Sequence, residues 1–188
     1  KRIAGIVKDL LAFSRQDREH HSPARIEDIV NSTLSLTRKI LTRDQIKVSV
    51  EMEAGLPQIK CRSQQIMQVL MNLITNARDA LNQRYPKFDD NKRIIITCRL
   101  HEIDGEQFVR TTLEDHGAGI PAAIQNRIMD PFFTTKSRDR GTGLGLSVSH
   151  GIIKEHRGNL SFETVEGEYT RFHIDLRVDN NWSLLEEE

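Results

Sequence analysis

An aspartate and two closely spaced glycines follow a predicted strand in the segment Asp115-His116-Gly117-Ala118-Gly119-Ile120. A carboxylate there can accept a hydrogen bond from an exocyclic amine such as the 6-amino group of adenine, whereas guanine would present an oxygen to it. A hydrogen bond to a charged group is worth roughly 1.5–3 kcal/mol, enough to favour adenine about tenfold or more. The glycines would let a ligand approach the backbone closely. The alternative is a turn that the aspartate only caps.

A second glycine-rich segment runs directly into a predicted helix. Glycines at alternate positions leave backbone N–H groups free to point at an anion, and the helix N-terminus adds partial positive charge, so the pattern favours phosphate. The spacing differs from the GxGxxG of dinucleotide folds because Val148 occupies the third place, and no GxxxxGK[ST] motif occurs. A purely structural turn is the alternative. The segment consists of Gly141, Thr142, Gly143, Leu144, Gly145 and Leu146.

Polar side chains recur every three or four residues along the predicted helix that starts at Ser63. Solvated helix faces usually carry lysine and glutamate, and a row of amides is less common. Amide oxygens are neutral hard ligands that magnesium accepts when phosphates supply the remaining charge. A plain solvated face is the alternative. The row comprises Gln65, Gln68, Asn72, Asn76 and Asp79.

Residues 121–141 are rich in polar side chains and contain Pro131, which indicates a long, mobile connection of the kind that is commonly functional. Within it, the adjacent aromatics Phe132 and Phe133 need a surface to pack against. Lys136 offers a compact positive charge for a phosphate, although an isolated lysine would simply be solvated.

Apolar periodicity predicts the helices and strands that must position these residues. Residues 26–41, 144–156 and the run from Ser63 have helical spacing, and Ser22 is a candidate cap for the first of these helices. Strands are predicted at 46–52, 93–101, 107–114, 159–165 and 169–178, the last four as two hairpins. This order favours an α+β fold, a two-layer α/β sandwich with helices on one face of a mixed sheet.

The composition excludes several classes of protein. The 27 basic residues are balanced by 27 acidic ones without a long basic run, so we expect no nucleic acid partner. Cys61 and Cys98 lie far apart and outside any CxxC motif, which argues against a zinc site or a disulfide framework. Because no run of about 18 apolar residues occurs, we expect a cytoplasmic domain, and it stays open whether a longer parent protein is membrane-anchored.

The first residues carry Ile3, Ile6, Leu10 and Phe13 at the spacing of a helix that packs on another helix. The partner would be a helix outside this sequence or a second copy of the chain. By pattern alone, a helix lying on its own domain is an equal alternative.

Four motifs in order resemble the nucleotide-binding boxes of sensor histidine kinases. Residues 72–80 (NLITNARDA), 115–121 (DHGAGIP), 130–136 (DPFFTTK) and 141–152 (GTGLGLSVSHGI) match the N, first glycine, F and second glycine boxes. The resemblance covers about residues 63–176, and residues 2–15 are similar to the second helix of the family's dimerisation domain. The family belongs to the GHKL ATPases, with gyrase, a heat-shock chaperone and a mismatch-repair ATPase. Its fold is an α/β sandwich with a flexible lid over ATP.

The resemblance implies a division of the chain and a role for each motif residue. Residues 1–19 would form the C-terminal part of a dimerisation and histidine-phosphotransfer helix. Residues 20–180 would form the catalytic domain that binds ATP and Mg²⁺, and residues 181–188 would be a tail. Asn76 would coordinate the metal and Asp115 would read the adenine amine, while Phe132 and Phe133 would anchor the lid. Asn72 and Lys136 would be the catalytic residues. The implied nucleotide-binding residues are Asn72, Asn76, Asp79, Asp115, Gly117, Gly119, Ile120, Phe133, Thr135, Lys136, Gly141, Thr142, Gly143, Leu144, Gly145, Leu146 and Thr170.

The implied activity is transfer of the γ-phosphoryl group of ATP to a histidine, for relay to an aspartate of a response regulator receiver domain. None of the seven histidines lies in the family's H-E-x-x-N-P type motif, so the phosphoacceptor domain is expected in another segment of the same protein, which would form a homodimer. Asn72 stands where hydrolysing relatives carry a glutamate that activates water, and an amide is a poor base. Tyr169 replaces the glycine usual before Thr170, which puts the backbone there in doubt. An ATP hydrolase and a degenerate nucleotide-binding module are the alternatives.

Overall fold

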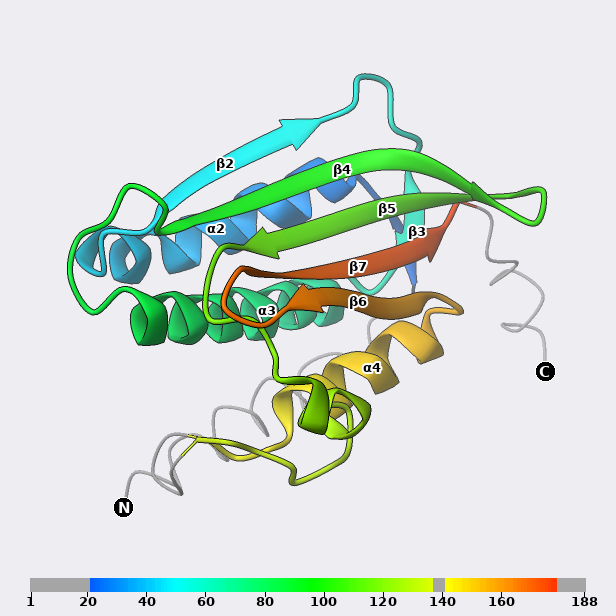
Figure 1. The fold of residues 1–188 in the computed structure, drawn as a ribbon. Helices are drawn as coiled ribbons and strands as arrows, with labels where there is room; N and C mark the ends of the chain where they lie inside the picture. Colours follow the sequence, from blue (N-terminus) through cyan, green and yellow to red (C-terminus); the bar gives the residue numbers. More distant parts are fainter. Residues whose placement is uncertain (1–20, 137–140, 179–188) are drawn as a thin grey trace, which may run out of the picture.

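Helix α3 (Ser63–Arg84) lies at the centre of the domain in the computed structural model, which describes residues 21–136 and 141–178. Its apolar side chains recur at helical spacing, and Ile66 and Leu81 are fully buried. The helix packs between α2 (Ile26–Arg43) and α4 (Gly145–Glu155) (Figure 1). All three predicted helices are therefore confirmed within the described residues.

Five strands form one mixed sheet in the order β2-β4-β5-β7-β6. Strands β2 and β4 run parallel, and the other neighbouring pairs are antiparallel. A parallel pair needs a crossover connection, and here the crossover contains α3. The predicted strands, both hairpins and the α+β sandwich are confirmed. The strands are β2 (Lys47–Met52), β4 (Arg93–Ile103), β5 (Glu106–Asp115), β6 (Asn159–Val165) and β7 (Tyr169–Arg177).

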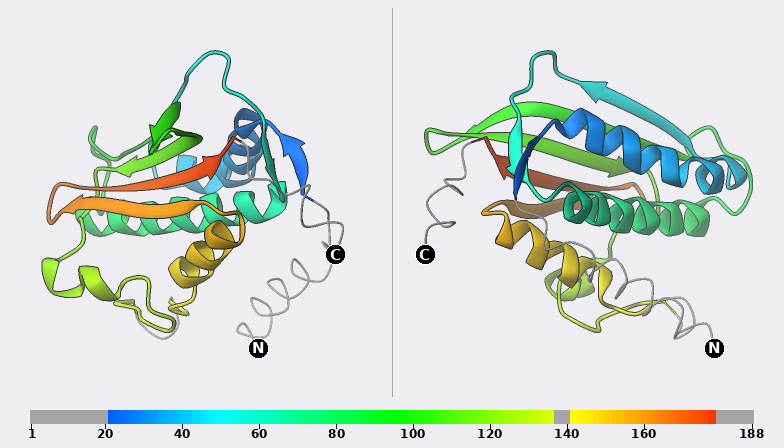
Figure 2. Two further views of the ribbon diagram at one scale, coloured as in Figure 1. Left: turned by 90° about the vertical axis from the view of Figure 1, so that its right-hand side faces the viewer. Right: turned by 180° about the vertical axis from the view of Figure 1, so that it is seen from behind.

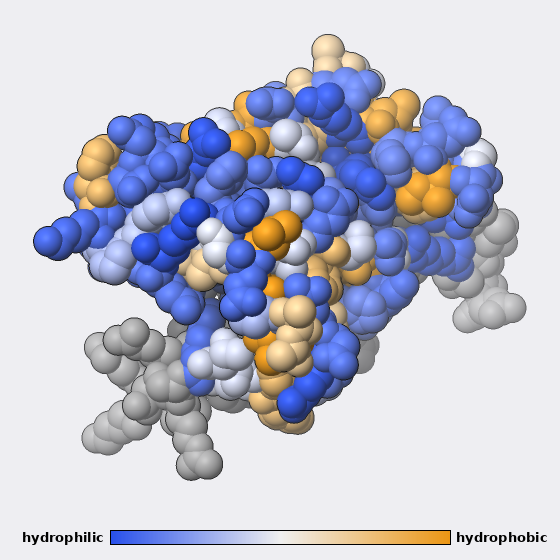
Figure 3. Space-filling model, viewed as in Figure 1, coloured by the Kyte–Doolittle hydropathy of each residue, from blue (hydrophilic) through white to orange (hydrophobic). Residues whose placement is uncertain are grey.

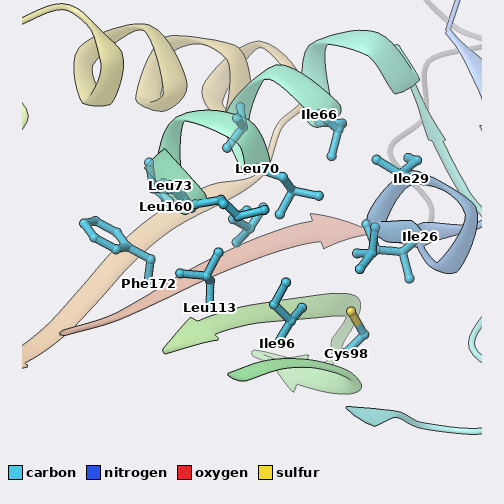
Figure 4. Close-up of a cluster of buried hydrophobic side chains, with 14 of the residues drawn as sticks. Ile26, Ile29, Ile66, Leu70, Leu73, Ile96, Cys98, Leu113, Leu160 and Phe172 are labelled. Carbon is cyan, nitrogen blue, oxygen red and sulfur yellow. The ribbon is translucent and has the colours of Figure 1, made fainter. Parts of the chain in front are cut away.

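The three helices cover one face of the sheet, as the view from behind in Figure 2 shows. Apolar side chains of the two layers meet between them, with Leu70 and Leu73 of α3 above Ile96, Leu113 and Phe172 of the strands (Figure 4). Burying one such side chain contributes about 1.5–3 kcal/mol. This shared core holds the polar face of α3 at a fixed position relative to the strand ends.

The opposite face of the sheet is mainly hydrophilic (Figure 3). Arg110 of β5 holds Asp175 of β7 in a bidentate ion pair, with Nε–Oδ1 at 2.6 Å and Nη2–Oδ2 at 2.9 Å. Four residues further along β5, on the same face, Arg171 Nε donates to Glu114 Oε2 at 2.7 Å. Because side chains alternate between the faces of a strand, Asp115 must point inward, toward the helices.

Three short elements were not predicted: β1 (Ser22–Ala24), β3 (Ile59–Cys61) and the 3₁₀ helix η1 (Ala122–Arg127). Strand β1 pairs with β3, so the prediction that Ser22 caps a helix is wrong. The N-cap residue of α2 is Arg25, which makes no side-chain cap hydrogen bond.

The predicted helix at residues 1–15 and the tail at 181–188 lie outside the described residues, and the division at residue 20 stays a prediction. Across residues 21–136 and 141–178, none of the helices combines the length and the apolar character needed to cross a bilayer.

Candidate functional site

The centre of the site is formed by two loops that lie against the polar face of α3. The acid loop (residues 115–119) follows β5, and the glycine loop (residues 141–145) leads into α4. Ala118 N donates to Ala80 O at 3.3 Å, which holds the acid loop against α3. Gly167 N donates to Ala118 O at 2.7 Å, which ties the same loop to the turn between β6 and β7. Motifs far apart in the sequence therefore meet around one helix.

Asp115 is the last residue of β5 and is only 2% exposed. Gly117 N donates to its Oδ1 at 2.9 Å, and its Oδ2 accepts no hydrogen bond from any described residue. Burial raises the pKa of Asp115 to about 7, although the Gly117 N–H lowers it in part and nearby Glu114 raises it further. A buried carboxyl with an unused oxygen is costly unless a ligand donates to it. Oδ2 is thus a candidate acceptor for an exocyclic amine.

Thr170 lies directly opposite Asp115 across the β5–β7 pair and is 3% exposed. Its Oγ1 is 3.2 Å from Thr164 Oγ1, which also accepts a hydrogen bond from Ile120 N at 2.9 Å. Tyr169 is a regular residue of β7 and pairs with Val165. The tyrosine in place of the usual glycine therefore leaves Thr170 in register with Asp115.

Gly119 is needed where the acid loop passes the β6–β7 hairpin. Its φ is +66°, and a Cβ at this position would lie 2.2 Å from the Val165 carbonyl oxygen. A larger residue would be strained in this conformation and would also push the loop away from the hairpin. Gly119 thereby keeps the loop that carries Asp115 next to the strand that carries Thr170.

Lys136 reaches the polar face of α3 from the segment 130–136. Its Nζ donates to Asn76 Oδ1 at 3.0 Å and to Asp79 Oδ2 at 2.6 Å. Arg78 Nη1 lies 3.5 Å from Asp79 Oδ1, so two cations share this carboxylate. Oxygens that already hold an ammonium group are hard ligands of the type that Mg²⁺ takes.

A metal held at Asn76 and Asp79 would need further ligands from a bound molecule. No cluster of three or more His, Cys, Asp or Glu suited to a metal exists in the described part of the chain. The phosphate oxygens of a nucleotide are the natural complement, because Mg²⁺ is usually bound by one or two protein groups together with phosphates. The residues present therefore fit Mg²⁺ as a companion of a nucleotide.

Asn72 joins α3 to the first turn of α4. Its Nδ2 donates to Gly145 O and to Ser149 Oγ, each at 3.2 Å, and its Oδ1 accepts no hydrogen bond from the residues that the structure describes. The backbone N–H groups of Gly145, Leu146 and Ser147 donate to no described residue. Free N–H groups at a helix N-terminus form an anion-binding site. The start of α4 is therefore suited to phosphate.

Gly143 connects the glycine loop to the segment that carries Lys136. Its φ is +67°, and a Cβ would lie 2.4 Å from the Phe132 carbonyl carbon. Phe132 N donates to Gly143 O at 2.8 Å. Phe133 packs against the core, as expected of an aromatic residue in a polar segment. The Arg127 guanidinium lies 4.5 Å from its ring centroid. Phe132 is 75% exposed, so the prediction that its side chain anchors this segment is wrong.

The other predicted residues lie around these contacts. Thr142 is exposed, and its Oγ1 accepts a hydrogen bond from Leu144 N at 3.3 Å. Thr135 is exposed, and its side chain forms no hydrogen bond with the described part of the chain. Gln65 and Gln68 form no hydrogen bond with either loop, so the polar row contributes only its C-terminal half. Half-buried positions beside the site are occupied by Ile120, Gly141, Leu144 and Leu146.

Four residues that shape the site were not predicted. Ser149 follows Gly145 by four residues on α4, a spacing that puts both on one face and could have located it. Arg84 and Thr164 act through contacts with groups distant in the sequence, and no local pattern marks them. Arg78 contacts Asp79, its neighbour in the sequence.

Comparison with known proteins assigns the part of the chain that contains this site to one family. Residues 61–180 match the family model described as histidine kinase-, DNA gyrase B- and HSP90-like ATPase. The chain is similar to sporulation kinase E of Bacillus subtilis, at 31% identity over 96% of this chain and 23% of that protein. It is also similar to the sensor kinase CckA of Brucella abortus, at 34% identity over 93% of this chain and 19% of that protein. The chain thus spans about a fifth to a quarter of these relatives.

Solved structures share the fold. The nucleotide-free catalytic domain of histidine kinase ThkA superposes with a TM-score of 0.69 at 24% identity, over 87% of this chain and 99% of that chain. Full-length ShkA in complex with AMPPNP gives a TM-score of 0.73 at 22% identity, over 93% of this chain and 35% of that chain. Together with the matched family model, these likenesses show that the chain belongs to the histidine kinase-, DNA gyrase B- and HSP90-like ATPase family and contains a catalytic domain of the sensor histidine kinase type.

Proposed function

We propose that the site binds Mg-ATP, with the adenine at Asp115 and the triphosphate along α3 toward the start of α4. The observation that carries this proposal is the buried Asp115 carboxyl with one unused oxygen. In this arrangement the adenine amine donates to Oδ2, and Thr170 flanks the base. The free N–H groups of the first turn of α4 receive phosphate oxygens.

We further propose that Asn76, beside Asp79, holds Mg²⁺ and that Lys136 binds phosphate. The Lys136 ammonium group donates to Asn76 Oδ1 and to Asp79 Oδ2, and it neutralises the Asp79 carboxylate. Arg78 stays near Asp79 when Lys136 turns to a phosphate. When bound, Mg²⁺ supplies charge neutralisation for the transferring phosphoryl group.

The whole protein, we infer, transfers the γ-phosphoryl group to a histidine and relays it to the aspartate of a response regulator receiver domain. The kinase names of the relatives support this proposal, as does the amide at position 72, which is a poor base for activating water. The phosphoacceptor histidine would come from another segment of the same protein, working as a homodimer. We place this activity in the cytoplasm, where ATP is available.

The test is a transfer experiment with γ-labelled ATP, Mg²⁺ and a polypeptide that carries the dimerisation helices and the phosphoacceptor histidine. We expect an acid-labile label on that histidine and none when Asp115→Asn replaces the wild-type chain. Tight nucleotide binding without transfer would refute the kinase proposal in favour of a binding module. Steady phosphate release from the isolated chain, abolished by Asn72→Ala, would refute it in favour of a hydrolase.

A further inference from the structure

Arg84 makes an unusual set of backbone contacts at the C-terminal end of α3. Its Nη1 donates to the carbonyl oxygens of His116 at 3.1 Å, Gly117 at 3.2 Å and Glu168 at 2.7 Å. One guanidinium nitrogen carries two N–H groups, so at least one of them is shared between two acceptors. The guanidinium also lies 5.1 Å from the ring centroid of Tyr85.

These contacts do not serve to cap α3. The carbonyl oxygen of Leu81 in the last turn already accepts a hydrogen bond from Tyr85 N at 2.8 Å. The three acceptors of Arg84 belong instead to the acid loop and to the turn between β6 and β7. Those two segments adjoin Asp115 and Thr170, the pair placed at the adenine.

All three acceptors of Arg84 Nη1 are backbone carbonyl oxygens, so Arg84 acts on the site through the position of the backbone. The neighbouring bonds Ala118 N–Ala80 O and Gly167 N–Ala118 O join the same three elements. Arg84 adds a side chain that donates hydrogen bonds to the acid loop and to the β6–β7 turn at the same time.

We propose that Arg84 is a positioning residue for adenine recognition, because its guanidinium holds the acid loop and the β6–β7 turn together so that Asp115 and Thr170 face the base. This inference rests on the proposed binding of ATP. It assigns a specificity-supporting role to a residue that touches neither the nucleotide nor the metal.

The test compares binding of adenosine and of Mg-ADP by calorimetry for the full 188-residue chain and its variants. For Arg84→Met we expect about tenfold weaker binding of both ligands by the same factor, since the loss lies at the base. Arg99→Met is the matched control, because Arg99 is exposed and pairs with Glu51, with Nη2–Oε2 at 3.5 Å, and not with a residue of the site. Lys136→Met should weaken Mg-ADP binding while leaving adenosine binding unchanged.

Two further measurements separate positioning from a general loss of structure. Backbone amide exchange at residues 117 and 118 should be faster in Arg84→Met, with thermal melting close to that of Arg99→Met. Arg84→Lys should recover part of the affinity, so that its binding is about threefold weaker than that of wild type. Lysine keeps a cationic donor but lacks the planar guanidinium with its several N–H groups. If Arg84→Met fails to fold, Arg84→Lys decides the question in the same titrations.

The possible failures are distinct. No binding of adenosine or Mg-ADP by the folded wild-type chain would refute the proposed function itself. Wild-type binding with unchanged affinities in both Arg84 variants would overturn the inference. A loss for Mg-ADP but not for adenosine would also overturn it, because Arg84 would then act at the phosphates.

Discussion

Replacing Asp115 with asparagine is expected to weaken nucleotide binding while stabilising the ligand-free domain as the pH rises. In the folded chain, burial raises the pKa of this carboxyl to about 7 from an ordinary value of 3.8. Between these two values the unfolded chain is ionised while the folded chain still holds its proton. The folded state therefore loses stability as the pH rises through this window, and above pH 7 the loss is complete.

The magnitude follows from the two pKa values. Their separation corresponds to about 4 kcal/mol at pH 8 and to about 2 kcal/mol at pH 5.5, taking about 1.4 kcal/mol per pH unit. Asparagine removes this cost, and its side-chain oxygen can still accept the Gly117 N–H. The advantage of Asp115→Asn over wild type should thus grow by about 2 kcal/mol from pH 5.5 to pH 8, or roughly 4–8 °C in melting temperature.

Thermal melting followed by circular dichroism at pH 5.5, 7 and 8 measures this difference. Glu102→Gln is the control, because Glu102 is exposed and the same change of carboxylate to amide there should give no growing difference. Adding Mg-ADP should raise the melting temperature of wild type and of Glu102→Gln but not of Asp115→Asn. A difference between Asp115→Asn and wild type that stays constant or shrinks with pH would refute the argument that a buried, protonated Asp115 destabilises the free domain.

Three other perturbations test separate parts of the site. Adenosine, which has no phosphate, should bind wild type up to about tenfold more tightly at pH 8 than at pH 6, because the pKa of Asp115 is about 7 and the ionised carboxylate accepts the amine. An affinity that calorimetry finds unchanged between these pH values would contradict this. Asn72→Asp loses the donor to Gly145 O, so the unfolding free energy in denaturant should fall by about 1–3 kcal/mol without any gain in phosphate release. Gly143→Ala should weaken Mg-ATP binding roughly tenfold or more while adenosine binding persists, because its Cβ would meet Phe132 at 2.4 Å; equal losses for both ligands would argue against a phosphate role.

Local signals were sufficient to predict most of the fold. The apolar repeat of α3 and the turns of the two hairpins are visible within a few residues, and the order of the elements then leads to the sandwich. Strands β1 and β3 were not predicted because each has three residues and exists only through pairing with the other, whose residues lie 35 to 39 positions away in the sequence. The assignment of Ser22 as a cap failed for the same reason.

The site was predictable where a motif residue acts through its own chemical type. The acid at 115, the amides at 72 and 76 and the lysine at 136 meet around α3 as the resemblance implied. Arg84 and Thr164 could not be found, because they bond backbone groups whose positions only the folded chain defines. The exposure of Phe132 could not be predicted from the sequence either, because an aromatic pair in a polar segment does not indicate which of the two rings packs against the core.

Titration of the folded chain with Mg-ADP and, separately, with Mg-GDP tests the central claim most directly. The arrangement of Asp115, the α3 amides and the start of α4 predicts saturable heat at one site for Mg-ADP, with Mg-GDP at least about tenfold weaker because its purine offers an oxygen to the carboxylate. No heat with Mg-ADP from well-folded protein, or equal affinity for the two nucleotides, would contradict it.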